Sequence, residues 1–454
     1  MRWLICALSL FACAQAAELS YDLDITFAEA GALTGMARVT GHAASAWPEA
    51  AFRCYPAAGS PEYLHPTKAE VGNEEVAWDS VHPTVFVVPL GAEADQTFSV
   101  TLEYQGFIPW LEDQDGYGTF ARSARCLVAS QAYPMLAPWE GGWVVEPIFP
   151  WGDAVVAEVA DYSAHVTLPQ GWDVVATGEE EGLPSSEYRV TGTNLREFAL
   201  VALKGYAVTE VHAEGVRVRS FFLPEHEAGG AAALEFTVEA LSIYADLFGP
   251  YPFSELDIVE VPLRNAAGVE YPGLILAGSQ YYAAYPNDPL FFPMIFAHEV
   301  AHQWWYAQVG NDQVAEPWLD EALATYTSGL FFEQRGDLQK ILSYWENTYT
   351  RGRQRNPEAT VSTPLWDFPG GAGYGGIVYS GGALFLHEVR RRMGDEAFFQ
   401  ALRRYIGEYR WEIAHGEDLL RILRAESSLP LDDLIRKWLG LSYTHEVALP
   451  TCAP

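Results

Sequence analysis

The chain has 454 residues, of which 49% are hydrophobic and 14% aromatic, so it holds enough apolar material for more than one packed core. Its formal net charge of −33 argues against nucleic acids and anionic membrane surfaces as partners, because both require basic patches. A solvated acidic surface accounts for such a charge, and a preference for cationic substrates, including peptides with a free amino end, is the alternative.

The first residues have the pattern of an export signal. Arg2 provides a positive start, residues 3–12 form a short apolar run, and Ala14-Gln15-Ala16 is a small-residue cleavage site. We therefore expect residues 1–17 to be a signal peptide and the protein to be exported, to the periplasm or the extracellular space. In the alternative, residues 10–13 are a lipoprotein box that tethers the protein through a lipid anchor at Cys13. No later stretch reaches the ~18 apolar residues of a transmembrane helix.

Three cysteines remain after removal of such a signal: Cys54, Cys126 and Cys452. In an oxidising compartment Cys54 and Cys126 could form a disulfide, which would leave Cys452 unpaired. Three free thiols are an equally good interpretation. No group of cysteines has the spacing of metal ligands.

Residues 18–208 have the pattern of a β-sheet domain. Short alternating or β-branched runs such as residues 97–104 and 165–168 are separated by turns, for example residues 169–171. Residues 178–182 have the composition of an exposed hairpin loop. We find no convincing catalytic group in this half, and expect it to pack beside a catalytic domain.

Residues 209–454 change to a mainly helical pattern that ends in a short helical C-terminal part. A strand is predicted at residues 256–261. Gly and Pro mark several of the boundaries. The predicted helices are residues 231–248, 290–309, 316–335, 379–393, 396–409 and 416–439.

The most informative motif is His298-Glu299-Val300-Ala301-His302, in the predicted helix 290–309. Positions i and i+4 of a helix lie on one face, so the two histidines can bind the same metal ion. Glu299 is then placed to reach a water at the metal without binding the metal itself. Burying these three side chains in so apolar a helix is costly unless a metal or another partner satisfies them.

Glu321, in the next predicted helix, can supply the third ligand. Catalytic zinc usually has three protein ligands and an open position for water. His298, His302 and Glu321 would form the two-histidine, one-glutamate set of a thermolysin-type site for one Zn²⁺ ion. The sequence thus predicts a zinc hydrolase.

These motifs resemble the aminopeptidase N family of gluzincin metallopeptidases. The resemblance extends from about Ser130 to Trp438 and is strongest between Gly249 and Gly394. It implies an α+β multidomain fold, in which an N-terminal β-saddle domain precedes a thermolysin-like, mainly helical catalytic domain.

Two flanking motifs add substrate contacts to the resemblance. In Gly268-Val269-Glu270-Tyr271, Glu270 occupies the place of the family glutamate that binds the substrate's α-ammonium, although Val269 and Tyr271 replace the family's methionine and asparagine. Tyr379, in Tyr379-Ser380-Gly381-Gly382, matches the tyrosine that donates to the oxyanion, although Gly381 replaces a lysine. A phenol suits that role, because it is a neutral donor at neutral pH.

Other polar and aromatic residues receive weaker assignments. Tyr374 is a second candidate for the oxyanion donor. Gln131 matches a substrate-binding glutamine of the family only poorly, and we expect it to be a solvated loop residue. No role is assigned to the residues near the ligands or on later helices: Trp304 and Trp305, expected in the core, and Asp320, His387 and Glu388.

The sequence therefore predicts a zinc-dependent aminopeptidase that hydrolyses the first bond of peptides with a free N-terminus. Loss of the family's methionine, asparagine and lysine leaves open a zinc endopeptidase, or an amide or epoxide hydrolase, on the same fold. A non-catalytic peptide-binding module is another alternative, but it would need neither Glu299 nor Tyr379 to hold the metal.

Overall fold

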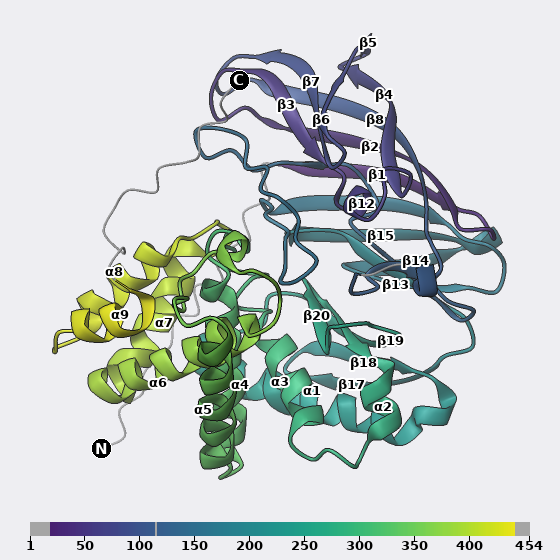
Figure 1. Cartoon of the computed structure of the whole chain (residues 1–454). Helices are drawn as coiled ribbons and strands as arrows, with labels where there is room; N and C mark the ends of the chain where they lie inside the picture. Colours follow the sequence, from purple (N-terminus) through teal and green to yellow (C-terminus); the bar gives the residue numbers. More distant parts are fainter. Residues whose placement is uncertain (1–18, 114–115, 441–454) are drawn as a thin grey trace, which may run out of the picture.

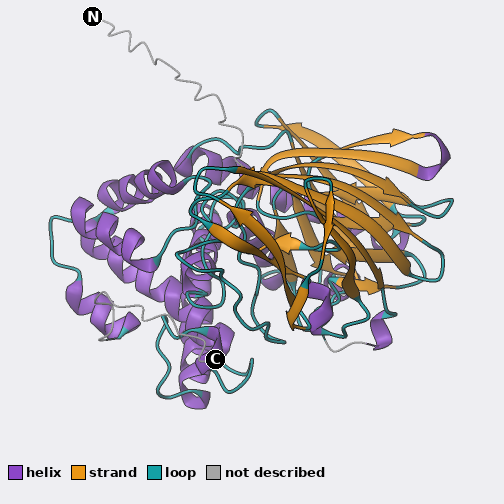
Figure 2. Cartoon of the chain, turned by 90° about the horizontal axis from the view of Figure 1, so that it is seen from above, coloured by secondary structure: helices purple, strands orange, loops and turns teal. Residues whose placement is uncertain are grey.

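The computed structural model describes residues 19–113 and 116–440. The expected signal peptide, Cys13 and Cys452 lie outside the described residues. The chain folds into a β-rich N-terminal part and a catalytic part with a smaller sheet and most of the helices (Figure 1). Seen from above, most of the helices lie on one side of the molecule and most of the strands on the other (Figure 2).

An eight-stranded sheet dominates the N-terminal part. In its strand Ser20–Phe27, burial alternates strictly, so that Tyr21, Leu23 and Ile25 face the core. This strand pairs in parallel with Ala160–Thr167. The strands follow the order β14 (Glu179–Leu183), β15 (Glu187–Leu195), β12 (Ala160–Thr167), β1 (Ser20–Phe27), β2 (Ala32–His42), β8 (Thr97–Phe107), β4 (Leu64–Val71) and β5 (Glu74–Val76).

Two four-stranded sheets complete this part. In the eight-stranded sheet, the expectation of an exposed hairpin loop at residues 178–182 is wrong, because β14 pairs with β15 there and forms an edge strand. One of the small sheets has the order β13 (Asp173–Ala176), β16 (Ala199–Leu203), β10 (Cys126–Ser130) and β9 (Phe120–Arg122). The other has the order β11 (Met135–Leu136), β3 (Trp47–Arg53), β7 (Val85–Ala92) and β6 (Asp79–His82).

The catalytic part begins with a five-stranded sheet. Its first strand, Ala207–Ala213, crosses position 208/209, where the sequence analysis divides the domains. The predicted strand 256–261 is confirmed as Glu255–Val261, which is buried throughout. The order of the sheet is β17 (Ala207–Ala213), β18 (Val216–Phe222), β19 (Glu255–Val261), β21 (Leu274–Gly278) and β20 (Gly268–Tyr271).

The helices of the catalytic part differ from the predicted ones in several places, one of which is the short helix Ser279–Ala284 that was not predicted. The predicted helix 290–309 ends early, at Ala301, and the predicted helix 416–439 is interrupted before Pro430. An amphipathic helix at 338–355 was not predicted. The α-helices are α1 (Glu227–Phe248), α2 (Ser279–Ala284), α3 (Phe291–Ala301), α4 (Trp318–Gln334), α5 (Leu338–Arg355), α6 (Gly382–Met393), α7 (Asp395–Tyr409), α8 (Gly416–Glu426) and α9 (Asp432–Leu439).

The two parts share a layer of apolar side chains. Val128, Val201 and Leu203, from β10 and β16, belong to one buried cluster with Val259 and Leu276, from β19 and β21. The sheet β13-β16-β10-β9 therefore packs on the five-stranded sheet, which fixes the β-rich part beside the catalytic part.

Cys54 and Cys126 are both buried and unpaired, so the disulfide alternative does not hold in this structure. Among the described residues, no helix is both long enough and apolar enough to cross a membrane.

Candidate metal and peptidase site

Helix α3 carries the first two predicted ligands in apolar surroundings. The carboxylate of Asp288 accepts the backbone N–H groups of Leu290 (3.2 Å) and Phe291 (2.9 Å), so it caps the first turn. His298 is partly buried near the end of α3. His302, the first residue after α3, is 1% exposed. A buried helix end of this kind presents both imidazoles at one fixed place.

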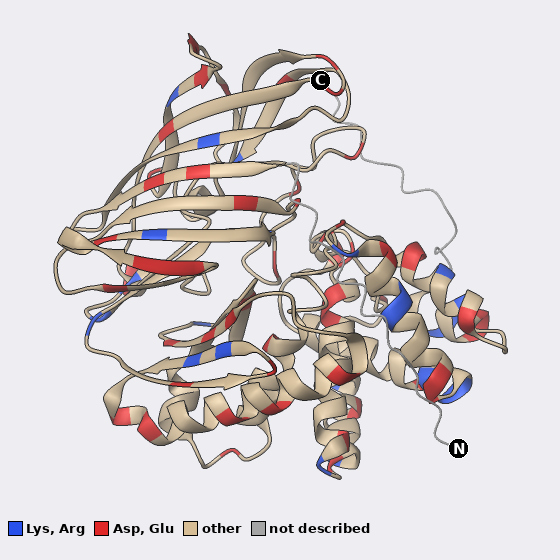
Figure 3. Cartoon of the chain, turned by 180° about the vertical axis from the view of Figure 1, so that it is seen from behind, with Lys and Arg blue, Asp and Glu red and all other residues tan. Residues whose placement is uncertain are grey.

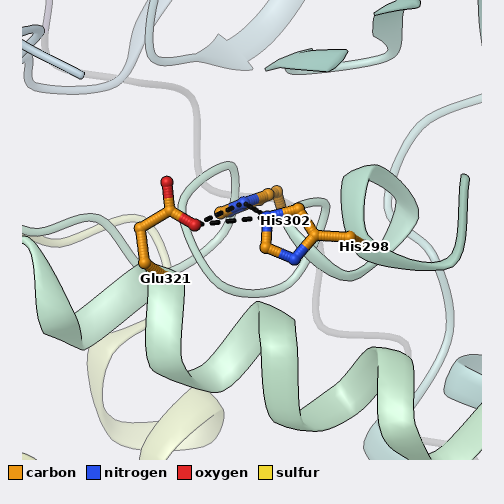
Figure 4. Close-up of side chains that lie close together, drawn as sticks. All are labelled: His298, His302 and Glu321. Atoms are coloured by element: carbon orange, nitrogen blue, oxygen red, sulfur yellow. Dashed lines mark hydrogen bonds and ion pairs between the residues drawn. The ribbon is translucent and has the colours of Figure 1, made fainter. Parts of the chain in front are cut away.

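Glu321 approaches the two histidines from α4, in which every residue from Trp318 to Phe332 is buried. Its Oε2 lies 3.2 Å from Nε2 of His298 and 3.5 Å from Nε2 of His302, and the two Nε2 atoms are 3.1 Å apart. Figure 4 shows the three side chains pointing at a common position. The structure thus brings together all three residues that the sequence predicts as ligands.

The donor set suits a metal ion such as zinc. Nδ1 of His302 lies 3.0 Å from the carbonyl oxygen of Trp305, which fixes the proton on Nδ1 and leaves Nε2 as the lone-pair donor. Oε2 of Glu321 is buried and makes no hydrogen bond. Burial opposes ionisation of Glu321, yet the two histidines hold its pKa well below the usual range. Two imidazole nitrogens and one carboxylate oxygen are typical zinc ligands.

Asp320 organises the backbone beside Glu321 rather than the imidazoles. Its carboxylate accepts the N–H of Glu321 (2.9 Å) and the side-chain amides of Asn311 (3.0 Å) and Gln313 (2.9 Å). Burial raises its pKa to about 6. The sequence assigned Asp320 no role, because these partners lie on a loop whose path it does not reveal.

Glu299 lies next to the ligands on α3, and Gly268 of β20 makes room for it. The carboxylate is 5% exposed, and its Oε2 makes no hydrogen bond. Burial raises its pKa, while the two neighbouring histidines lower it. A Cβ atom at Gly268 would lie only 2.6 Å from Cδ of Glu299. The close approach of β20 therefore requires glycine at this position.

Tyr379 lies on the other side of the ligands. A π-helical segment, η6 (Gly376–Gly381), carries it into the site before α6 begins. Its hydroxyl donates to Oε1 of Glu321, and its ring stacks on His298 with centroids 5.8 Å apart. Tyr374 packs against the ring of Tyr379, but its buried hydroxyl makes no hydrogen bond.

Glu270, in β20, lies beside the ligands at the wall of the cavity. It is 6% exposed, and Gln313 donates to its Oε1 over a long 3.5 Å. Burial raises its pKa well above the usual range, and nearby His302 opposes this rise. Glu270, Glu299, His298, Glu321 and Tyr379 all line one cavity of about 400 Å³.

The sequence of the catalytic part matches a family model. Residues 232–438 match the peptidase family M1 domain. The chain is 28% identical to aminopeptidase M1-B of Oryza sativa subsp. japonica over 242 residues, which are 50% of this chain and 27% of the rice protein. It is 22% identical to endoplasmic reticulum aminopeptidase 2 of Bos taurus over 355 residues, or 73% of this chain and 36% of that protein.

Solved structures of M1 peptidases share the whole architecture of the chain. An M1 zinc metallopeptidase from Deinococcus radiodurans has a TM-score of 0.68 and 21% identity, with 93% of this chain and 94% of that chain covered. Residues 232–438, which make up most of the catalytic part, form a peptidase family M1 domain. The fold of the chain is the two-domain M1 fold, with an N-terminal β-sheet domain followed by a mixed, mainly helical catalytic domain.

The matched part of the chain spans only 27% of the length of the first rice relatives. Those proteins are much longer, so their activities cannot be assigned to this chain from the match alone. A second M1 structure from Deinococcus radiodurans, of a mutant with a bound Tyr-Ser-Ala substrate, has a TM-score of 0.67 and 21% identity, with 93% of this chain and 94% of that chain covered.

The M1 site of this chain also receives side chains from the β-rich part, where the sequence indicated none. Asp153 lines the cavity together with Glu270. The expectation of a solvated Gln131 is wrong, because Gln131 is 8% exposed and donates to the buried carboxylate of Glu197. Tyr306 donates to the same carboxylate. No local motif marks Asp153 or Glu197, since only the fold brings them to the site.

The remaining predictions in the catalytic part concern packing. Trp304 and Trp305 are each 1% exposed, as expected of core residues, and their indole N–H groups donate to the carbonyl of Gly249 and the hydroxyl of Thr327. Glu388 accepts hydrogen bonds from Lys437 and Trp438, which gives it a structural contact between α6 and α9.

Proposed function

We propose that the protein is a zinc-dependent aminopeptidase that hydrolyses the N-terminal peptide bond of peptides. One observation carries the proposal: the buried carboxylate of Glu270 opens into the same cavity as His298, Glu299 and Glu321. A carboxylate without a cation beside a metal site suits the free ammonium group of a peptide. The Tyr-Ser-Ala peptide bound to the Deinococcus radiodurans structure supports peptides as the substrate class.

His298, His302 and Glu321 would hold one Zn²⁺ ion. Bound zinc lowers the pKa of a coordinated water and polarises a carbonyl group. The three side chains are preorganised for this task, since Trp305 orients His302 and α4 keeps Glu321 buried. The backbone contact fixes the imidazole, which raises metal affinity.

Glu299 acts as the general base and acid. It takes a proton from the attacking water and delivers that proton to the amine that leaves. Its carboxylate is well suited, because burial raises its pKa and no hydrogen bond occupies its Oε2. Gly268 leaves the space in which the carboxylate can turn from water to leaving group.

Tyr379 and Glu270 bind two different groups of the substrate, the scissile carbonyl and the α-ammonium. The phenol of Tyr379 donates a hydrogen bond to the oxyanion that develops at the scissile carbonyl. In the structure the same hydroxyl donates to Glu321, so it already points at the metal position. Glu270 binds the α-ammonium, which places the first peptide bond at the ligands and excludes bonds farther along the peptide.

The variant Glu299→Gln tests the general base. The amide fills the same space but cannot take a proton, so we expect full zinc binding with a loss of kcat of about 10²–10⁴-fold or more. Zinc content by metal analysis and peptide hydrolysis by chromatography measure the two effects separately. Normal turnover in this variant would contradict the assignment of Glu299.

We also propose, from the sequence pattern of residues 1–17 alone, that the protein is exported, with a lipid anchor at Cys13 as the alternative to release. Cell fractionation of the full-length chain, with Cys13→Ala as the comparison, separates the two forms. Export without change in the variant supports release, and loss of membrane association in the variant supports the anchor.

A further inference from the structure

A second cavity adjoins the cavity of the metal ligands. It has a volume of about 520 Å³ and lies between the β-rich part and the catalytic part. Tyr117, Asp153 and Glu270 line both cavities, so Glu270 stands at the boundary between them. A group held by Glu270 therefore has direct access to the second cavity as well as to the ligands.

Four carboxylates line the second cavity: Asp113, Asp153, Glu197 and Glu270. No Lys, Arg or His is among the described residues that line it. Within the described part of the chain, none of the four lies within 4.0 Å of a Lys or Arg nitrogen as an ion pair. The cationic groups that act on these carboxylates, Arg196 and His302, lie outside the lining of the cavity.

Glu197 is the most informative of the four carboxylates, because it is almost fully buried, with 2% exposure. Its carboxylate accepts only neutral donors, the amide of Gln131 and the hydroxyl of Tyr306. The adjacent Arg196 directs its guanidinium at backbone carbonyls instead. Burial raises the pKa of Glu197 to about 7, against the lowering effects of its two hydrogen bonds and of nearby Arg196.

The rest of the cavity suits a long side chain with an apolar stem. Five tyrosine rings contribute to its wall, and aromatic rings pack well against methylene groups and attract a nearby cation. A lysine or arginine side chain combines both features, since a polar head follows three or four methylene groups. The five tyrosines are Tyr55, Tyr63, Tyr117, Tyr271 and Tyr306.

We propose that the second cavity binds the first side chain of the substrate and selects lysine or arginine. The inference rests on the proposed function, because Glu270 must hold the α-ammonium for the first side chain to enter this cavity. A cationic head then pairs with Asp113 and Glu197, while an acidic side chain meets uncompensated negative charge.

The overall acidity of the chain does not account for this cavity. Asp and Glu are spread over both parts of the molecule, and many of them lie beside Lys or Arg or in solvent (Figure 3). Solvated carboxylates are stabilised by water and select no ligand. The cavity carboxylates differ, because Glu197 and Glu270 are buried and form no ion pair with a Lys or Arg in the part of the chain that the structure describes.

The test compares kcat/KM for aminoacyl arylamides of lysine, norleucine and glutamate, with the zinc-loaded full chain. Norleucine matches the lysine stem but lacks the ammonium group, so the ratio of lysine to norleucine isolates the charge. We expect a ratio of about ten or more, and very slow cleavage of the glutamate compound. A ratio of one or below overturns the inference.

Two variants test which carboxylates provide the negative charge that favours lysine. Asp113→Asn and Glu197→Gln each remove one negative charge, and we expect both to lower the lysine to norleucine ratio while norleucine cleavage continues. Glu112→Gln is the matched control for Asp113→Asn, because Glu112 is also exposed but does not line the cavity. Since Asp113 is exposed, its variant folds even where Glu197→Gln does not. An unchanged ratio in Asp113→Asn and in folded Glu197→Gln overturns the inference.

The two hypotheses fail in different ways. If no aminoacyl arylamide and no free peptide is cleaved, the proposed function itself is wrong. If norleucine and other neutral substrates are cleaved as fast as lysine or faster, the aminopeptidase stands and only the cationic selection is wrong.

Discussion

At the scale of single residues, Gly268 allows a test of how precisely the carboxylate of Glu299 must be positioned. In Gly268→Ala the new Cβ would lie 2.6 Å from Cδ and 2.7 Å from Cγ of Glu299, so the carboxylate must move. Displacement of a catalytic group by about 1 Å lowers turnover by as much as about 10²-fold, so we expect kcat to fall at least tenfold.

Steady-state kinetics and zinc analysis check this prediction. Zinc content should stay normal, because the three atoms nearest to the new Cβ belong to Glu299 and not to a ligand. Gly370→Ala serves as the control, since nothing lies within 4 Å of a Cβ at that position. Equal activity of both glycine variants would show that Glu299 tolerates displacement.

Tyr379 allows a second prediction at this scale. Tyr379→Phe removes the hydroxyl that points at Glu321, and we expect kcat to fall about 10²–10³-fold with zinc retained. Tyr374→Phe is a close control, because that ring touches Tyr379 but its hydroxyl makes no hydrogen bond. A larger loss in Tyr374→Phe than in Tyr379→Phe would reverse the assignment of the oxyanion donor.

The three predicted ligands lie together in the structure, because their positions follow from short-range geometry. His298 and His302 share a helix face at a spacing of four, and Glu321 follows on the next helix. Asp153, Gln131 and Glu197 could not be predicted in the same way. They come from loops and strands of the β-rich part, and only the packing of that part on the catalytic sheet brings them to the site.

At the scale of elements, Arg196 holds the turn that follows α3. Its guanidinium, 1% exposed, donates to the carbonyls of Tyr306 (2.5 Å), Ala157 (3.0 Å), Gln308 (3.2 Å) and Glu412 (2.8 Å). It thereby ties three distant segments together. Because Trp305 orients His302, this turn also affects the metal ligands.

We predict that Arg196→Met lowers both stability and zinc affinity. The carbonyls of Tyr306 and Ala157 would lose the guanidinium donor, and those of Gln308 and Glu412 would keep only a backbone N–H, at a cost of about 3 kcal/mol or more in the free energy of unfolding. Looser support of His302 should weaken zinc binding about tenfold, measured by competition with a chelator. Arg403→Met is the control, since it removes one exposed hydrogen bond. Unchanged zinc affinity in a destabilised Arg196→Met would limit Arg196 to a structural role.

The same turn explains why the predicted helix 290–309 is too long. The sequence contains no glycine or proline between His302 and Val309, so its local pattern favours continuation. The helix nevertheless ends at Ala301, and Tyr306 has a φ of 140°, because tertiary hydrogen bonds hold the turn. Helix α5 was missed for a different reason: most of its residues are polar, and its apolar face is narrow, with only Ile341, Trp345 and Gly352 buried.

At the scale of the whole molecule, His415 links the two parts and makes their contact dependent on pH. It lies 3.2 Å from Glu316 and 3.6 Å from Glu140, a residue of the β-rich part. The hydrogen bond to Glu316 raises the pKa of His415 from its ordinary 6.5 to about 9, against the effect of burial. The folded pKa exceeds the unfolded one, so the stabilisation is complete below pH 6.5 and is lost as the pH rises through about 9.

Thermal unfolding of His415→Asn at several pH values measures this contribution. His415 is 49% exposed, so we expect Tm to fall only about 1–3 °C at pH 6, and the difference from the original chain to vanish near pH 10. His212→Asn, on the exposed side of β17, controls for loss of an imidazole elsewhere. A difference in Tm that grows with pH would contradict the sign of the effect.

The proposed aminopeptidase activity depends most directly on the free amino group of the substrate. The decisive measurement is hydrolysis of matched free and N-acetylated peptides by the zinc-loaded protein, with Glu299→Gln as the inactive control. We predict that free peptides lose one residue at a time from the N-terminus and that acetylated peptides stay intact, because only a free ammonium binds Glu270. Cleavage of both forms at internal bonds would contradict the account and identify an endopeptidase.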